Sequence, residues 1–218
     1  MPMLSNLKTI VLAGSIGVGF LVQASPSYAA ELETLTVAGG CFWCVEADFE
    51  KVEGVTEAVS GYAGGTAANP TYKQVTSGGS GHYEAVQITF DPDLVSEAKL
   101  LDIFFRSIDP TDAGGQFCDR GPSYRTAIFA TDSQKDVAEQ SKAKAQAELG
   151  QQIVTPILGE ADFYPAEAYH QDYAKGTKII LTRYGPKSQA KAYKAYREAC
   201  GRDKRVKELW GSAAPFAG

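Results

Sequence analysis

The sequence places one cysteine, Cys41, where a thiol could act as a nucleophile. It follows a segment rich in β-branched residues, 34–38, and two glycines, and it begins a segment, 41–52, with apolar residues at helical spacing. Unsatisfied N–H groups at the start of a helix stabilise an anion, so we expect the pKa of this thiol to be lowered. The glycines allow a sharp turn and leave the sulfur uncovered. A buried structural cysteine is the alternative interpretation.

Cys41 and Cys44 also form a C-x-x-C motif, a spacing found in thiol–disulfide exchange sites and in half of a zinc site. Zinc is disfavoured because the other two cysteines and both histidines stand alone, so we expect no metal and no bound cofactor. The bulky side chains between the two cysteines, Phe42 and Trp43, suit a small apolar pocket better than a disulfide presented to large partners. Core packing is the alternative for these aromatic residues.

Alternating strand and helix patterns predict the elements that must position these groups. The predicted strands are residues 34–38, 83–90, 124–130 and 153–158, and the predicted helices are residues 41–52, 96–108, 133–149 and 166–174. Three glycine-rich loops, 60–65, 77–81 and 114–121, lie between them, and long loops with polar or aromatic side chains often carry a site. We therefore predict an α/β (α+β) two-layer sandwich, a single domain with a mixed central sheet and long Gly-rich loops.

The N-terminal segment, residues 1–29, has the pattern of a secretory signal peptide. A single charge, Lys8, precedes an apolar run over residues 9–22, and small residues end the segment near Ala29. The run is shorter than the roughly 20 residues of a membrane span. We therefore expect cleavage near Ala29, a periplasmic catalytic domain of residues 30–218 and no stable membrane insertion. An uncleaved anchor is the alternative.

The charge balance makes nucleic acid an unfavourable partner. The 218 residues include 21 Lys and Arg against 26 Asp and Glu, a net charge of −5. Phosphate binding is driven by cationic side chains, which an acidic chain does not supply in excess. Four cysteines are too few for a disulfide-stapled scaffold of this length, so apolar burial must provide the core.

Six blocks between residues 34 and 185 resemble, in order, those of the A-type peptide-methionine sulfoxide reductases. They are Gly-Gly-Cys-Phe-Trp at 39–43, Val-Ser-Gly-Tyr-Ala-Gly-Gly at 59–65, Asn-Pro-Thr-Tyr at 69–72, Gly-His-Tyr-Glu-Ala-Val at 81–86, Asp-Arg-Gly with Tyr-Arg-Thr-Ala-Ile between 119 and 128, and Phe-Tyr-Pro-Ala-Glu with Tyr-His-Gln between 163 and 171. The resemblance implies repair of oxidised proteins, in which the S epimer of methionine sulfoxide, free or in a protein, is reduced to methionine. We expect a monomer.

The resemblance also implies the roles of individual residues. Cys41 is the nucleophile that attacks sulfur and becomes a sulfenic acid, and Glu84 is the acid that protonates the sulfoxide oxygen. A carboxyl donor near neutral pH needs a raised pKa, so Glu84 should lie in a partly apolar pocket, although the strand pattern also allows an exposed position. Tyr72 and Tyr124 donate hydrogen bonds to the oxygen, and Asp119 orients the site and supports the thiol through water.

The resemblance implies a substrate-binding role for the two aromatic residues after Cys41, and the two histidines lie within the same family blocks. Phe42 and Trp43 form the walls around the S-methyl group, because sulfur and aromatic rings attract modestly. His82 and His170 match positions of the family blocks, and we interpret both as structural hydrogen-bonding residues.

A second thiol must turn the sulfenic acid into a disulfide, which a dithiol reductant then opens. We expect the resolving thiol to be Cys200, in a loose C-terminal tail of about residues 186–218, followed by Cys118 and then Cys44. Cys118 departs from the Asn common at that family position. A relay of the three thiols and a structural disulfide between two of them are alternatives. Because export separates the protein from cytosolic thioredoxin, we expect a thioredoxin-like domain, supplied with electrons across the membrane, as the reductant.

Two other functions compete with the sulfoxide reductase. An exported thiol–disulfide oxidoreductase would use Cys41 and Cys44 as its exchanging pair, and a non-enzymatic module would use its cysteines only to brace the fold or bind metal. The six ordered blocks favour the reductase.

Overall fold

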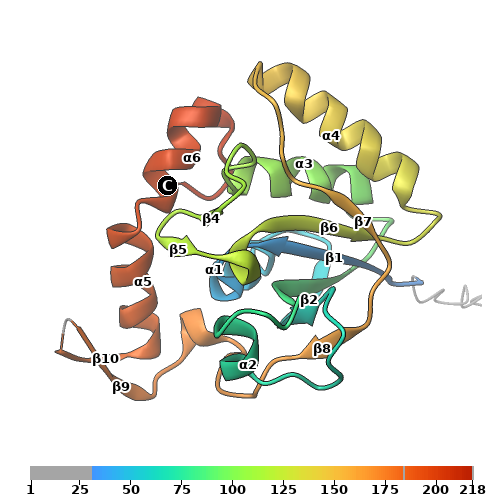
Figure 1. Cartoon of the computed structure of the whole chain (residues 1–218). Helices are drawn as coiled ribbons and strands as arrows, with labels where there is room; N and C mark the ends of the chain where they lie inside the picture. Colours follow the sequence, from blue (N-terminus) through green and yellow to red (C-terminus); the bar gives the residue numbers. More distant parts are fainter. Residues whose placement is uncertain (1–30, 184, 218) are drawn as a thin grey trace, which may run out of the picture.

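The fold is built on a central mixed sheet. The computed structural model describes residues 31–183 and 185–217, and the predicted signal peptide lies outside them. The strands of the sheet are β1 (Glu33–Gly39), β2 (Val55–Ala63), β3 (Tyr83–Phe90), β6 (Thr126–Ala130), β7 (Ile157–Gly159) and β8 (Phe163–Pro165). Their order is β7-β6-β1-β3-β2-β8, and every neighbouring pair is antiparallel except the parallel pair β6 and β7 (Figure 1). The predicted α/β fold with a mixed sheet is confirmed.

The helices are α1 (Phe42–Phe49), α2 (Tyr72–Thr76), α3 (Glu97–Ser107), α4 (Lys135–Leu149), α5 (Gln189–Ala199) and α6 (Arg202–Trp210). Helices α1, α3 and α4 cover one face of the sheet. Alternate residues of the strands, such as Leu35 and Val37 on β1, form one core with α1, α3 and α4. The opposite face carries small side chains, such as Ala38 and Ala85, and packs against Phe163 of β8 and Leu158 of β7.

Local sequence signals account for several helix boundaries. Ser96 caps α3 as its pattern predicts, with its hydroxyl accepting a hydrogen bond from the Lys99 N–H. Thr71 and Gln74 form a capping box at the start of α2, which fixes the position of Tyr72. These caps matter to the site because α2 is only five residues long.

Two predicted elements are wrong, and side-chain packing explains both. Residues 166–174 form turns and the start of a 3-10 helix (Tyr173–Lys175) rather than an α-helix, because Asp172 adopts a positive φ of 52° and Gln171 bonds to the backbone of β2. The predicted loop 60–65 begins inside β2. The β8 backbone passes so close to Gly61 that an added Cβ would lie 2.5 Å from the Tyr164 carbonyl oxygen.

The boundaries of two predicted strands also shift. The segment predicted as strand 124–130 begins with a 3-10 turn, Pro122–Tyr124, before β6, and only the end of the predicted strand 153–158 pairs, as β7. The predicted strands 34–38 and 83–90 are confirmed within one residue.

The C-terminal segment is packed against the body of the protein, in contrast to the expected loose tail. A hairpin of β9 (Ile179–Thr182) and β10 (Gly185–Ser188) leads into α5 and α6. Val206 and Trp210 on α6 are buried in the main core. No helix within residues 31–183 and 185–217 is long and apolar enough to cross a lipid bilayer.

Candidate active site

Cys41 lies at the start of α1, at the edge of a pocket. It is the N-cap residue, and its carbonyl oxygen accepts a hydrogen bond of 3.0 Å from the Cys44 N–H. Gly40 turns the chain with a φ of +81°, and a Cβ at this position would meet the Gln116 side chain at 2.5 Å. The strand–turn–helix geometry predicted around Cys41 is therefore present.

The thiol pKa values are the reverse of the expectation from helix geometry. The pKa of Cys41 is raised well above its usual value by its hydrogen bond with Cys44, by burial and by the nearby carboxyl groups of Glu84 and Asp119. The hydrogen bond lowers the pKa of Cys44 to about 7, against the effect of burial, and Arg202 assists. The prediction of a lowered pKa at Cys41 is wrong because burial and neighbouring acids outweigh the helix terminus.

Glu84 is buried on β3 beneath the turn that carries Cys41. Its side chain is 1% exposed, and Oε2 accepts a hydrogen bond of 3.1 Å from the Phe42 N–H. Its Oε1 has no hydrogen-bond partner among the described residues. Burial raises the pKa of Glu84 to about 8, against the Phe42 N–H, which lowers it, and the Asp119 carboxyl raises it further. The expectation of a raised pKa is confirmed, and the alternative of an exposed strand residue is wrong.

Two tyrosines from different elements lie beside this carboxyl group. Tyr72 is the first residue of α2, and Tyr124 ends the 3-10 turn before β6. The Tyr124 side chain interacts with both Glu84 and Tyr72. Burial, and then the charge of Glu84, raises the pKa of Tyr72 to about 12 and raises that of Tyr124 as well. Both phenols therefore remain hydrogen-bond donors at neutral pH.

Asp119 completes the polar part of the site from a small hairpin of β4 (Gly115–Gln116) and β5 (Asp119–Arg120). Burial raises the pKa of its carboxyl group, while the Arg202 guanidinium opposes this shift. The structure therefore brings together, from separate elements, the side chains predicted to be catalytic. These are Cys41, Tyr72, Glu84, Asp119 and Tyr124.

The aromatic pair after Cys41 has a fixed orientation. Phe42 is 1% exposed and its ring contacts those of Tyr72 and His170. Trp43 stacks on Tyr173 at a centroid distance of 3.6 Å, and its Nε1 donates a hydrogen bond of 3.1 Å to His170 Nδ1. Burial lowers the pKa of His170 to about 4, so the ring is neutral and can accept this bond.

Sequence reasoning assigned no role to two residues that hold this aromatic cluster, Glu167 and Tyr173. Glu167 Oε1 accepts a hydrogen bond of 3.0 Å from the Tyr72 N–H, and Oε2 accepts one of 2.9 Å from the Tyr62 hydroxyl. Glu167 lies within the sixth sequence block, so the family resemblance could have indicated a role for it. No sequence pattern indicates that Tyr173 stacks on Trp43. His82 is structural as expected, because its Nδ1 accepts a hydrogen bond from the Gly65 N–H.

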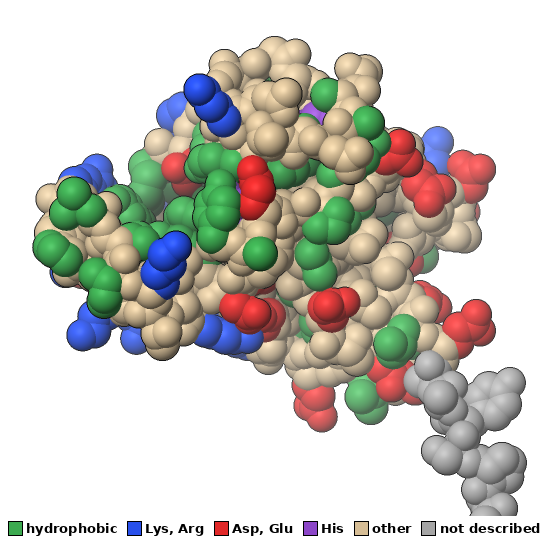
Figure 2. All heavy atoms as spheres, turned by 90° about the horizontal axis from the view of Figure 1, so that it is seen from below, with side chains coloured by type: hydrophobic (Ala, Val, Ile, Leu, Met, Phe, Trp, Pro, Cys, Tyr) green, Lys and Arg blue, Asp and Glu red, His purple; other side chains and the backbone are tan. Residues whose placement is uncertain are grey.

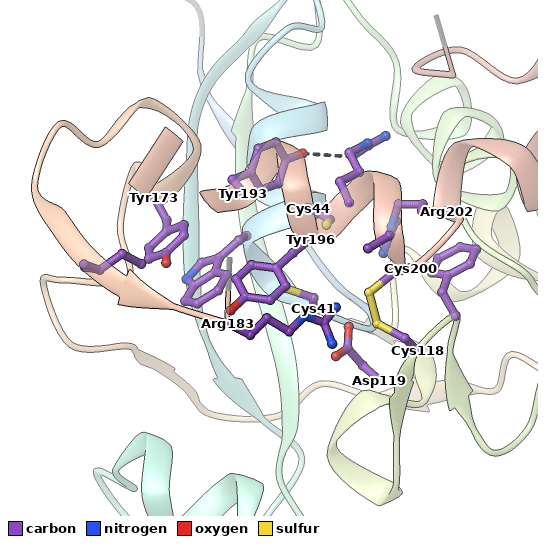
Figure 3. Close-up of a pocket in the computed structure, with 15 residues that line it drawn as sticks. Cys41, Cys44, Cys118, Asp119, Tyr173, Arg183, Tyr193, Tyr196, Cys200 and Arg202 are labelled. Atoms are coloured by element: carbon purple, nitrogen blue, oxygen red, sulfur yellow. Dashed lines mark hydrogen bonds between the residues drawn. A yellow bond between two sulfur atoms is a disulfide. The ribbon is translucent and has the colours of Figure 1, made fainter. Parts of the chain in front are cut away.

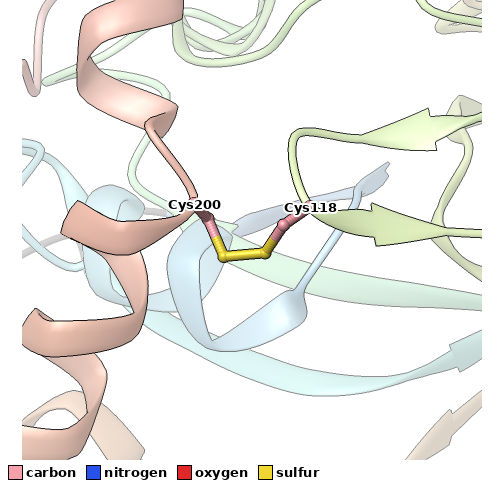
Figure 4. Close-up of a disulfide and its surroundings, with 2 residues drawn as sticks. All are labelled: Cys118 and Cys200. Carbon is pink, nitrogen blue, oxygen red and sulfur yellow. A yellow bond between two sulfur atoms is a disulfide. The ribbon is translucent and has the colours of Figure 1, made fainter.

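The pocket beside Cys41 contains all four cysteines. It has a volume of about 630 Å³, and Figure 3 shows Cys41, Cys44 and the sulfur bridge around it. Cys118, between β4 and β5, is joined by a disulfide to Cys200 at the end of α5, with a Cα–Cα distance of 5.0 Å (Figure 4). Cys41 and Cys44 are free thiols. Cys200, the first candidate for the resolving thiol, is therefore bonded to Cys118, the second candidate.

Buried Arg202 anchors the segment that carries Cys200. Its Nη1 donates to the Ser107 carbonyl at 2.9 Å and its Nη2 to the Gly39 carbonyl at 2.7 Å. These bonds tie the start of α6 to the turn before Cys41, so the disulfide and the nucleophile are held on one rigid frame.

A group of acidic side chains lies away from this pocket. Glu46, Glu50 and Asp172 lie within reach of a common cation. Glu46 is already hydrogen bonded to the Ser60 hydroxyl and the Asp172 N–H, and Lys175 pairs with Glu50 at 2.7 Å. The group is therefore satisfied by protein partners.

Comparisons with known proteins agree on one family. The family model described as peptide methionine sulfoxide reductase matches residues 33–212. The chain is 50% identical over 204 residues to peptide methionine sulfoxide reductase MsrA 2 of Rhizobium meliloti, covering 92% of this chain and 96% of that one. It is 49% identical over 184 residues to peptide methionine sulfoxide reductase MsrA of Bacillus subtilis, covering 83% and 97%. The crystal structure of reduced Mxr1 from Saccharomyces cerevisiae is 30% identical, with a TM-score of 0.62, over 66% of this chain and 84% of that one.

Proposed function

This chain belongs to the peptide methionine sulfoxide reductase family, and on that premise we propose how its residues carry out the reaction. The protein is an oxidoreductase, a peptide-methionine (S)-S-oxide reductase, which reduces the S epimer of methionine sulfoxide. The proposal rests above all on Glu84. One of its oxygens is held by the Phe42 N–H, and the other is unpartnered beside the Cys41 thiol.

Substrate binding uses the aromatic cluster and the phenols together. The S-methyl group packs against Phe42 and Trp43, whose orientations are held by His170 and Tyr173. The sulfoxide oxygen accepts hydrogen bonds from Tyr72 and Tyr124, which stay protonated because their pKa values are raised. An apolar methyl group and a polar S=O bond are thus recognised side by side.

In the chemical step, the Cys41 thiolate attacks the sulfoxide sulfur while Glu84 donates its proton to the oxygen. With a pKa of about 8, the Glu84 carboxyl is mostly protonated at neutral pH. The protonated oxygen is then transferred to the Cys41 sulfur as the S–O bond of the substrate and the newly formed S–S bond break, so methionine leaves and Cys41 becomes a sulfenic acid. Asp119 adds negative charge near the thiol and orients the site.

Regeneration requires a second thiol of this chain and an external dithiol. We propose a thioredoxin-like reductant that opens the disulfide formed. We also propose export to the periplasm, as the N-terminal segment predicts, with oxidised proteins as substrates.

Single-turnover reduction of the two separated methionine sulfoxide epimers, by mature protein with free Cys41, tests these assignments. We expect methionine only from the S epimer, and none in Cys41→Ser. If neither epimer reacts while insulin disulfides are reduced, the C-x-x-C exchange function replaces this one, and Glu84 has no role as an acid.

A further inference from the structure

We propose that Cys44 resolves the sulfenic acid on Cys41, and that Cys118 and Cys200 form a second redox pair that receives the oxidation afterwards. This inference rests on the proposed function. Cys44 lies one helical turn from Cys41, its N–H donates a hydrogen bond of 3.0 Å to the Cys41 carbonyl oxygen, and its side chain is 8% exposed and lines the same pocket as Cys41. A C-x-x-C pair at a helix start can close a disulfide without moving either backbone segment.

The aromatic residues between the two cysteines do not separate the sulfurs. Phe42 is directed into the core against Tyr62, and Trp43 lies flat on Tyr173. Both thiols therefore remain at the pocket, which Cys41 and Cys44 line together. The sequence placed Cys44 last among the candidate resolving thiols because two bulky residues, Phe42 and Trp43, stand between it and Cys41. In the structure neither ring lies between the two cysteines.

The charges around Cys44 favour its thiolate, the attacking form. Arg202 and Arg197 both lower its pKa, whereas the buried Asp48 carboxyl raises it. Asp48 is paired with Arg197 at 3.0 Å, which reduces its effect on the thiol. Burial, which disfavours a thiolate, is thus offset by two guanidinium groups and the Cys41 hydrogen bond.

The thiol chemistry balances over two exchanges. The Cys44 thiolate attacks the sulfur of the Cys41 sulfenic acid, an S–S bond forms, the S–O bond breaks, and the oxygen leaves as water after taking up a proton. When Cys118 and Cys200 are reduced, one of them attacks the Cys41–Cys44 disulfide, and the other closes the Cys118–Cys200 bond. The thiols on α1 are thereby restored. The external dithiol then returns two electrons to the Cys118–Cys200 disulfide.

The protein in the state seen here provides a direct test. With the Cys118–Cys200 disulfide intact, one equivalent of the S epimer is added, and the products are alkylated and mapped by mass spectrometry. We expect one methionine per chain and a Cys41–Cys44 disulfide. A persistent Cys41 sulfenic acid, trapped by dimedone, or a Cys41–Cys200 disulfide would overturn the proposal. Absence of methionine would instead contradict the proposed function itself.

Two variants separate the steps when all thiols are reduced at the start. In Cys118→Ser/Cys200→Ser, the Cys41–Cys44 disulfide should accumulate because nothing within the chain reduces it. In Cys44→Ser, dimedone should label Cys41. The readout is the oxidation state of Cys41 rather than a rate, so a partly destabilised variant remains informative. Rapid formation of a Cys41–Cys200 or Cys41–Cys118 disulfide in Cys44→Ser would count against Cys44.

A second inference comes from an independent observation, the distribution of charge along the chain. Residues 175–218 contain eleven Lys and Arg against three Asp and Glu, whereas residues 31–174 contain nine against 23. Figure 2 shows blue and green side chains gathered on the left lobe, and red side chains over much of the remaining face. The C-terminal segment is thus a cationic surface on an acidic protein.

The cationic segment also exposes apolar side chains. On β9, Ile179 is 66% exposed and Leu181 is 85% exposed, while Ile180 between them faces the cysteine pocket. The lysines around this hairpin make no ion pair with a described residue. They are Lys178, Lys187, Lys191 and Lys194. An exposed apolar strand marks a protein-binding surface, and the lysines around it attract a partner of opposite charge.

We infer that this surface, made of β9, β10 and the outer face of α5, docks an acidic face of the dithiol reductant. Ile180 and Arg183 line the same pocket as Cys118 and Cys200, so a protein bound to the hairpin reaches the disulfide. The attraction between unlike charges raises the rate of association and is screened by salt.

Kinetics with a reduced thioredoxin of net negative charge test this surface. Lys187→Glu/Lys191→Glu should raise the KM for thioredoxin about fivefold or more, whereas activity with dithiothreitol should not change. Lys135→Glu/Lys142→Glu, on the distant helix α4, is the matched control. Raising the salt from about 50 to about 300 mM should raise the KM of the wild type. If the variant raises the KM for an oxidised protein substrate and not for thioredoxin, the surface serves the substrate and this inference is wrong.

Discussion

Replacing Glu84 by Gln removes the acidic proton with little other change. The amide keeps an oxygen that can accept the hydrogen bond from the Phe42 N–H, and it has almost the volume of the carboxyl group. It cannot act as an acid. The variant therefore isolates proton donation from the structural role of this buried side chain.

The pKa of Glu84 sets the expected size and pH dependence of the effect. Burial raises this pKa to about 8, so about nine tenths of the carboxyl groups are protonated at pH 7 and about one tenth at pH 9. General acid catalysis contributes about 10²- to 10⁴-fold. We therefore expect Glu84→Gln to lower the single-turnover rate by about 10²- to 10⁴-fold at pH 7.

The ratio of wild-type to variant rates reports on Glu84 itself. Ionisation of the Cys41 thiol increases both rates as the pH rises, so it cancels in the ratio. The ratio should be constant below about pH 8 and fall about tenfold per pH unit above it, as the wild type loses its acidic proton. The measurement is rapid-quench methionine formation from the S epimer between pH 6 and pH 10.

Glu57→Gln, an exposed residue of β2, controls for the change of one negative charge. It should leave the rate within about twofold of the wild type, since it lies outside the site. A Glu84→Gln rate within about tenfold of the wild type, or a ratio constant up to pH 10, refutes the role of Glu84 as the proton donor.

The site and the C-terminal frame support further expectations. Tyr72→Phe, which removes one donor to the sulfoxide oxygen, should lower kcat/KM about 10²-fold, and an unaltered value would exclude this hydrogen bond from the transition state. Cys118→Ser/Cys200→Ser should lower the free energy of unfolding by about 4 kcal/mol in urea titrations, because the bond closes a loop with a sequence separation of 82 residues. Arg197→Met leaves the buried Asp48 carboxylate with the partly exposed Lys51 ammonium, at 3.2 Å, as its ion-pair partner, and should cost about 3 kcal/mol of unfolding free energy. Adding Asp48→Asn should recover part of that loss, and no recovery would show that the ion pair is not the cause.

Several features of the fold could be predicted because they depend on local patterns. The strand β3 has the predicted bounds, since its β-branched and aromatic residues lie between a glycine and an Asp-Pro turn. The Ser96 cap of α3 also follows from residue type alone. The segment 166–174 could not be predicted in this way. Its backbone is held by side-chain contacts with β2 and α1, which are distant in sequence.

By itself, the sequence determined the family and the order of the motifs that carry the predicted site residues. The blocks around Cys41, Tyr72, Glu84 and Tyr124 are short and contiguous, so they could be recognised without coordinates. That these blocks together belong to one family also follows from the sequence, since the family model matches residues 33–212.

Only the tertiary structure decided the pKa values of the thiols and which cysteines form a disulfide. The interaction between Cys41 and Cys44 is the largest cause of the raised pKa of Cys41 and of the lowered pKa of Cys44, and burial, carboxyl groups on β3 and β5, and Arg202 from α6 add to it. The bond between Cys118 and Cys200 joins residues 82 positions apart. Ionisation and disulfide pairing depend on distances through space and on local desolvation, and neither quantity is contained in the spacing of residues along a chain.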